Sequence, residues 1–128
     1  MRVILDTHVI IWAIQGSPKL SKAARDIISD DNNDVYFSTV SLIEISIKRK
    51  AHPDEMPFDA REARKLFVES GYEELTVDSS HAEAMDGLPL LHRDPFDRLL
   101  LAQAKANGMK VVSHDNRLPQ YGDFVITV

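Results

Sequence analysis

Residues 2–6 read RVILD and residues 110–115 read KVVSHD, so a short apolar run ends at a carboxylate twice in this chain. Runs rich in branched aliphatic residues are typical of buried strands in parallel sheets. Stretches of helical pattern separate the strand-like runs, and this alternation predicts an α/β fold with a central parallel sheet flanked by helices. Ligands of such sheets bind outside the carboxyl ends of the strands, so we expect Asp6 and Asp115 to lie at a binding edge.

The other elements follow from hydrophobic period and from turn residues, and they give about five strands in one domain that spans residues 1–128. The predicted strands are 2–5, 35–38, 73–77, 110–113 and 124–128. The predicted helices are 8–14, 20–30, one from Asp59 to near Gly71, 81–87, and one from Asp97 to near Gly108. Asp59 is expected to cap the helix that it precedes, one of Asp78, Ser79 and Ser80 to cap the next helix, and residues 88–95 to form a loop.

The segment 39–50, TVSLIEISIKRK, fits two patterns. Ile43, Ile45 and Ile47 alternate with polar residues as in a strand, whereas Val40, Ile43 and Ile47 lie on one face of a helix. Either pattern puts Glu44 and Lys48 on a shared side.

Four acidic residues are therefore expected at one edge of the sheet: Asp6, Glu44, Asp97 and Asp115. Each one has an ordinary structural explanation, such as a turn for Asp6 and Asp115, a favourable helix dipole for Asp97, or a capping box of Glu44 with Ser41. Carboxylates that lie close together repel one another and raise each other's pKa, so such a cluster destabilises the folded protein unless a cation binds. Mg²⁺ and Mn²⁺ bind oxygen ligands and commonly act on phosphate esters.

Composition narrows the classes of protein. The 128 residues are 44% hydrophobic, include no cysteine and carry a net charge of −5. The absence of cysteine excludes disulfides and thiolate metal sites and favours a cytoplasmic protein. No run is long enough to span a membrane, and Asp6 and His8 interrupt the apolar N-terminus, which argues against a signal peptide. The negative net charge argues against strong electrostatic attraction to nucleic acid, although it does not exclude nucleic acid as a partner.

Other chemistries fit less well. Ser113, His114 and Asp115 are adjacent, so they point to alternate faces of a strand and cannot form a catalytic triad. No glycine-rich phosphate-binding motif is present, and the histidines lack the spacing of a helical metal site. Trp12 is expected in the core.

The chain resembles the PIN-domain ribonucleases of the VapC-like toxin group. The resemblance rests on VILDTHVIIWAI (3–14), STVSLIEISIK (38–48), LPLLHRDPFDRLLLAQA (88–104) and VVSHDNRLPQYG (111–122), and it favours a helix for the second segment. It implies a PIN-like sheet with Asp6, Glu44, Asp97 and Asp115 around Mg²⁺ or Mn²⁺. It also implies endonucleolytic cleavage of RNA, leaving a 5′-phosphate and a 3′-hydroxyl, a homodimer, and a cognate antitoxin whose tail fills the active-site groove.

The resemblance assigns the third ligand to Asp97 rather than to the nearby Asp94, and implies supporting roles for Thr7 and Asn116 at the metal or substrate. Lys48 or Arg98 is expected to stabilise charge on a phosphate oxygen.

Two alternatives stay open at this point. A haloacid-dehalogenase-like phosphatase needs a second aspartate two residues after the first, where this chain has His8. A non-catalytic PIN-like binding or scaffold module typically lacks one or more of the acids, and here all four are present.

Overall fold

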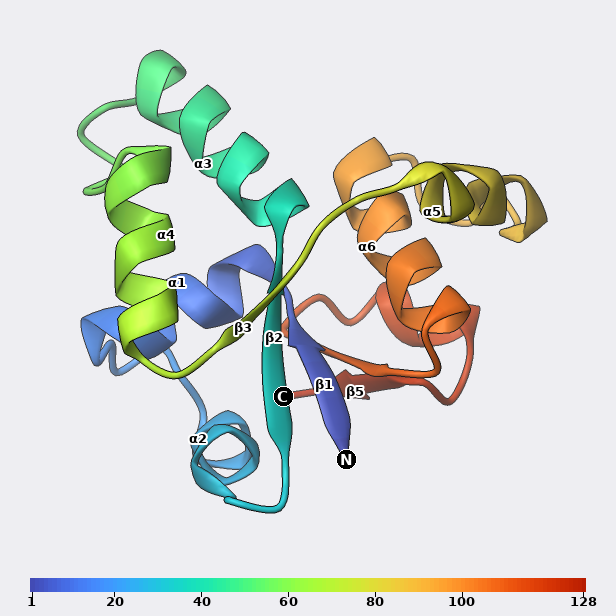
Figure 1. Ribbon diagram of the computed structural model, residues 1–128, viewed down its shortest axis with the longest axis horizontal. Coiled ribbons are helices and arrows are strands. Elements are labelled where there is room, and N and C mark those ends of the chain that lie inside the picture. Colours follow the sequence, from blue (N-terminus) through green and yellow to red (C-terminus); the bar gives the residue numbers. More distant parts are fainter.

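A computed structural model describes residues 1–128 (Figure 1). The strands are β1 (Arg2–Leu5), β2 (Asp34–Ser38), β3 (Glu73–Leu75), β4 (Lys110–Ser113) and β5 (Val125–Thr127). The helices are α1 (Thr7–Gln15), α2 (Lys22–Ser29), α3 (Thr39–Ala51), α4 (Ala60–Glu69), α5 (Ser79–Ala84) and α6 (Pro95–Ala106). Short 3₁₀ helices cover Met85–Gly87 and Leu118–Tyr121.

The five strands form one parallel sheet in the order β3-β2-β1-β4-β5, which confirms the predicted class. β1 lies at the centre, with Leu5 in register with Val112 of β4 and Ile4 in register with Tyr36 of β2. The chain order reverses beside β1, because β2 continues on one side and β4 on the other. The carboxyl end of β1 is therefore the topological switch point, where α/β folds bind ligands.

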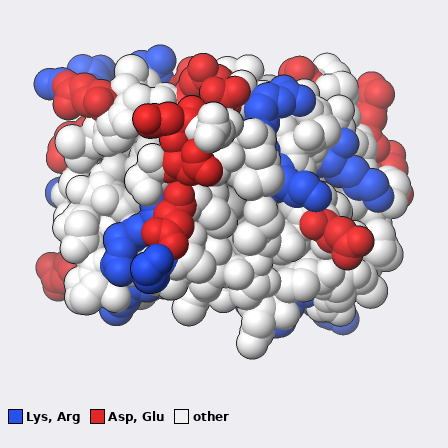
Figure 2. All heavy atoms as spheres, turned by 90° about the horizontal axis from the view of Figure 1, so that it is seen from below, with Lys and Arg blue, Asp and Glu red and all other residues white.

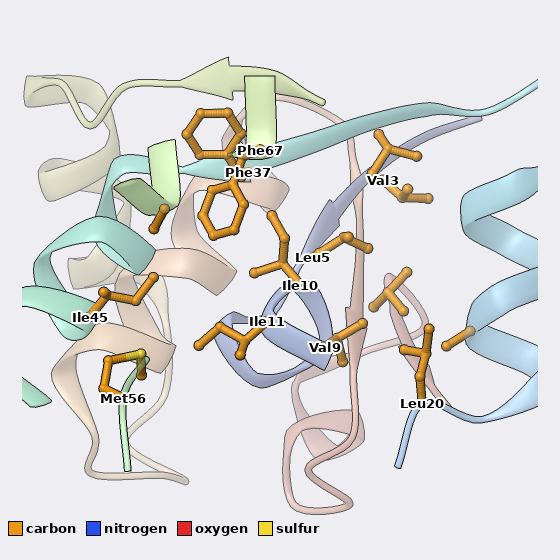
Figure 3. Packing of buried hydrophobic residues seen from close by; sticks show 14 residues of the cluster. Val3, Leu5, Val9, Ile10, Ile11, Leu20, Phe37, Ile45, Met56 and Phe67 are labelled. Atoms are coloured by element: carbon orange, nitrogen blue, oxygen red, sulfur yellow. The ribbon is translucent and has the colours of Figure 1, made fainter. Parts of the chain in front are cut away.

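Alternate residues of β1 serve two hydrophobic cores, one on each face of the sheet. Val3 and Leu5 pack with α1, α2, α3 and α4 in a cluster that includes Phe37 and Phe67, whose rings lie 5.1 Å apart (Figure 3). Ile4 faces the other core, which α6 and the 3₁₀ helix Leu118–Tyr121 cover. Figure 1 shows the same division, with α1, α3 and α4 on one side and α5 and α6 on the other.

Segment 39–51 is a helix, which resolves the ambiguous pattern. Ser38 caps it by accepting a hydrogen bond from the N–H of Val40. The helix begins at Thr39, so Glu44 lies in its second turn and the capping box with Ser41 is wrong.

The helix that carries Asp97 begins earlier than the sequence predicted. Asp94 is its N-cap and accepts hydrogen bonds from the N–H groups of Phe96 and Asp97, while Pro95 takes the first helical position. Proline is favoured at that position because an N–H group there would have no acceptor within the helix, so its absence costs no hydrogen bond. Asp97 therefore lies at the third helical position and does not open the helix.

Smaller corrections concern three segments. The third strand ends at Leu75 instead of residue 77, and α5 begins at Ser79 instead of His81. Asp78 caps α5 as expected, in a reciprocal capping box with His81, and Asp59 caps α4. Trp12 is only partly buried, because its ring lies at the rim of the core near the carboxyl end of the sheet.

No helix has both the length and the hydropathy that crossing a membrane requires. Figure 2 shows the face seen from below Figure 1, where acidic side chains form a band and lysine and arginine side chains lie in separate groups. This face has no broad basic surface.

Candidate active site

Two neighbouring strands deliver the first and fourth acids to the same edge. Asp6 directly follows β1, and its N–H donates to the carbonyl of Val112 on β4. Ser113, the last residue of β4, donates a 2.6 Å hydrogen bond to Oδ2 of Asp6, and its oxygen accepts one from the N–H of Asp115. The buried Ser113 hydroxyl thus links the two acids and fixes the carboxylate of Asp6, which is 7% exposed.

Helix α3 supplies the second acid from the other side of β1. Thr7 donates a 2.8 Å hydrogen bond to Oε1 of Glu44, and its oxygen lies 2.8 Å from Oγ of the buried Ser41. Burial is the main cause that raises the pKa of Glu44 to about 7, while the hydrogen bond from Thr7 works against the shift and the charges of Asp6 and Asp97 add to it.

The third acid lies in the first turn of α6. Oδ2 of Asp97 is 2.8 Å from Nε2 of His92, and the carboxylate is 14% exposed. Tyr121 holds the preceding loop in place, because its hydroxyl accepts hydrogen bonds from the N–H groups of Leu91 and His92. Burial, aided by the charge of Asp6, raises the pKa of Asp97 to about 6, although His92 opposes the shift.

The fourth acid differs from the others because it has a cationic partner. Arg117 donates to both carboxylate oxygens of Asp115, with Nη2 2.7 Å from Oδ2 and Nε 3.0 Å from Oδ1. The Arg117 guanidinium lowers the pKa of Asp115 to about 2. The side chain of Arg117 is mostly exposed, so its guanidinium is accessible to an anionic ligand.

All four acids line one cavity of about 290 Å³ that has no hydrophobic lining. Its lining residues are Asp6, His8, Glu44, Asp94, Asp97, His114, Asp115 and Arg117. The only group whose donor atoms lie within 4.8 Å of one another is His92, Asp94 and Asp97, so the four acids surround a cavity larger than one tight coordination shell.

The chemistry of this donor set fits a hard divalent cation. Carboxylate oxygens predominate, and Mg²⁺ and Mn²⁺ prefer oxygen ligands while keeping several waters. Burial, and then the neighbouring negative charges, raise the pKa values of Glu44 and Asp97. A cation bound between these carboxylates would favour their ionised forms.

The supporting residues named from the sequence lie in different places. Thr7 contacts Glu44, and Lys48 lines an adjoining cavity that also includes Thr7 and Glu44. Arg98 donates to the carbonyl of Leu88 and does not line the cavity of the acids. Asn116 is exposed next to Asp115.

Sequence reasoning missed Arg117, which pairs with Asp115. It considered Asp94 only as an alternative ligand, whereas Asp94 lines the cavity and also caps α6, and it assigned no contact to His92, which lies against Asp97. The spacing Asp115-x-Arg117 was visible in the sequence, and the turn after β4, in which Asp115 accepts from the N–H of Arg117, brings the two side chains together.

The PIN domain family matches this sequence over residues 3–123. No curated protein sequence matches it. Among solved structures, a chain of VapBC2 from Rickettsia felis, bound to a DNA fragment from the promoter, is 16% identical with a TM-score of 0.73 and covers 100% of this chain and 98% of that one. A chain of DNA-bound VapBC from Salmonella typhimurium is 18% identical, with a TM-score of 0.67 and coverage of 99% and 98%. A chain of a toxin–antitoxin complex from Klebsiella pneumoniae is 16% identical, with a TM-score of 0.67 and coverage of 98% and 96%. At these identities the likeness establishes the fold.

Proposed function

This chain belongs to the PIN-domain family, and from that premise we propose that it is a metal-dependent endoribonuclease, the toxin of a toxin–antitoxin pair. The observation that carries the proposal is the convergence of Asp6, Glu44, Asp97 and Asp115 on one polar cavity at the switch point of the sheet. We further propose that residues 1–128 act as a single nuclease domain.

These four acids would hold Mg²⁺ or Mn²⁺, and the bound ion lowers the pKa of a water and screens the charge of the phosphodiester. The residues of the chain have two tasks beside the metal. Ser113 and Thr7 orient the carboxylates of Asp6 and Glu44. One of the carboxylates would accept the proton of the attacking water.

Positive charge for the substrate comes from the rim of the cavity. Arg117 presents a mostly exposed guanidinium there, and Lys48 lines the adjoining cavity. Both can donate to phosphate oxygens as charge builds up during in-line attack. The products are a 5′-phosphate and a 3′-hydroxyl, and no side chain becomes covalently attached.

The partners follow from the same proposal. The similar structures come from toxin–antitoxin complexes, which supports a cognate antitoxin for this chain, and such a pair would act in the cytoplasm. A homodimer is supported by exposed large side chains on α3 and α4, namely Ile43 and Val68, each about half exposed.

The test is cleavage of single-stranded RNA by the purified protein with added Mg²⁺ or Mn²⁺. Cleavage that requires the metal and is lost when the acids are replaced supports the proposal. A protein that binds RNA but cuts none under these conditions is a binding module instead.

A further inference from the structure

A second cavity of about 490 Å³ adjoins the cavity of the acids, and the proposed chemistry uses only its Thr7, Glu44 and Lys48. The two cavities share His8 and Glu44. Apolar side chains and aromatic rings form much of its wall, including Ile11, Ile47 and Phe96, and Lys48 adds a positive charge. Its volume and mixed lining are typical of sites that take a small ring system.

His8, at the junction of the two cavities, is held by an aromatic stack. Its ring lies 5.9 Å from that of Trp12 with an interplanar angle of 28°, and Trp12 meets the ring of His114 edge-on at 5.1 Å. Trp12 is partly buried and packs against the core, whereas His8 is exposed. The stack therefore fixes the plane of an imidazole that a ligand can reach.

We propose that this second cavity binds a nucleobase of the RNA, stacked on His8, while the adjacent phosphodiester lies over the acids. This inference rests on the proposed function, because it assumes that the scissile phosphate binds in the cavity of the acids. A base and the nearest phosphate are one sugar apart in a nucleotide, and the two cavities adjoin at His8 and Glu44. Stacking on an aromatic ring tolerates any base, because every base has a π-face.

The lining supports this occupant. Lys48 offers a cation for the phosphate next to the base, and Phe96 offers a second ring in the same cavity. His8 acts by contact with the substrate and not by titration, so its effect belongs to the binding of RNA and not to the chemical step.

The kinetic test compares a short single-stranded RNA that the protein cuts with the same RNA carrying one abasic nucleotide beside the cut site, on either side in turn. For the unmodified protein, one of the two abasic strands should raise KM about tenfold, the size expected for one stacked base, and should leave kcat within twofold. The variant His8→Ala should show that tenfold rise with intact RNA, and the abasic strand should add less than twofold. The matched variant His8→Phe keeps a ring and should retain most of the affinity.

A second readout uses Trp12, the only tryptophan of the chain, and does not require cleavage. Intact RNA, titrated in Ca²⁺, should change its fluorescence, whereas a fully abasic strand of equal length should not, and His8→Ala should weaken the response. If the protein cuts no RNA, the proposed function fails, and this readout alone decides the base site.

Two results overturn the inference while the nuclease proposal stands. One is cleavage with the same KM for intact and abasic strands. The other is a His8→Ala variant in which the abasic strand still raises KM by the full amount. That result would mean that the base does not stack on His8.

Discussion

The hydroxyl of Thr7 donates a 2.8 Å hydrogen bond to Oε1 of Glu44 across the carboxyl end of the sheet. Thr7 opens α1, directly after the first acid, and Glu44 lies on α3, so this bond joins the two helices that flank the site. It favours the ionised carboxylate, which burial disfavours. Thr7 therefore positions an acid that we propose as a metal ligand, and it favours the ionised form of that acid.

Replacing Thr7 with valine should raise the Mg²⁺ concentration needed for half-maximal cleavage several-fold, because Glu44 loses its donor and its pKa rises further. The free energy of unfolding should fall by about 1–2 kcal/mol, since the hydroxyl of Ser41 also loses a buried partner. Thr7→Ser keeps the hydroxyl and is the matched control. An unchanged Mg²⁺ requirement in Thr7→Val would show that Glu44 needs no such support.

Replacing Asp97 with asparagine should remove nearly all cleavage without destabilising the metal-free protein. Asparagine keeps the volume and can still contact His92, but it lacks the charge that binds a cation. Because the folded-state pKa of Asp97 is about 6, its charge opposes folding at pH 7, and removing that charge should stabilise the protein by about 1 kcal/mol. Thermal melting in EDTA, beside an RNA cleavage assay, measures both effects.

Asp94 supplies the contrast for that experiment, because it caps α6. Asp94→Ala should lower the free energy of unfolding by about 1 kcal/mol, whereas Asp94→Asn retains a capping oxygen and should melt close to the unmodified protein. If Asp97→Asn melts several degrees lower in EDTA, Asp97 is a structural residue and the third ligand is misassigned.

The metal-free protein should become more stable as the pH falls from about 8 to 5. Glu44 and Asp97 have folded-state pKa values of about 7 and 6, above their ordinary values, so the folded state binds protons that the unfolded state does not hold. Their destabilising effect is full above pH 7 and disappears as the pH falls toward 4. Asp115, with a pKa of about 2, contributes stability that is lost only below about pH 4.

Denaturant unfolding in EDTA across this pH range measures the change, which we expect to be about 2 kcal/mol. Glu44→Gln should flatten the curve, because the group with the highest pKa is gone. If the free energy of unfolding of the unmodified protein falls steadily from pH 8 to 5, ionisation of these carboxylates does not destabilise the folded state.

The exposed side chains of α3 and α4 should form the dimer contact. Ile43 and Val68 are each 49% exposed, and burying them against a second copy removes apolar surface from water. Ile43→Glu should shift the protein toward a monomer in sedimentation experiments at micromolar concentration, while the surface change Lys22→Gln, on α2, should not. A protein that sediments only as a monomer without substitution would exclude the homodimer.

The sequence predicted the parts of the site that depend on strand ends. Asp6 and Asp115 follow buried apolar runs, and a parallel sheet brings the carboxyl ends of such runs to one edge. Periodicity alone left Glu44 undecided, because three isoleucines at alternate positions fit a strand as well as a helix. Tertiary packing settled it: Ile45 is fully buried, whereas Ile43 and Ile47 are about half exposed.

Other features depend on contacts between distant segments, and local pattern does not contain them. The bond of Thr7 to Glu44 joins residues 37 positions apart, and that of Ser113 to Asp6 joins residues 107 apart. The position of Trp12 at the rim of the core, between two histidines, follows from packing at the end of the sheet. The start of α6 was misplaced because Asp94 and Asp97 both suit a helix N-terminus, and only Asp94 precedes the proline.

The most direct test of the account is RNA cleavage by the purified protein with each of three metal conditions: Mg²⁺ or Mn²⁺, Ca²⁺ alone, and excess EDTA. Cleavage should occur with Mg²⁺ or Mn²⁺ and should be absent with Ca²⁺ alone and in EDTA, because Mg²⁺ and Mn²⁺ take a tighter octahedral coordination than Ca²⁺ and activate a bound water. Cleavage that continues undiminished in excess EDTA would contradict the central claim that Asp6, Glu44, Asp97 and Asp115 form a metal-dependent nuclease site.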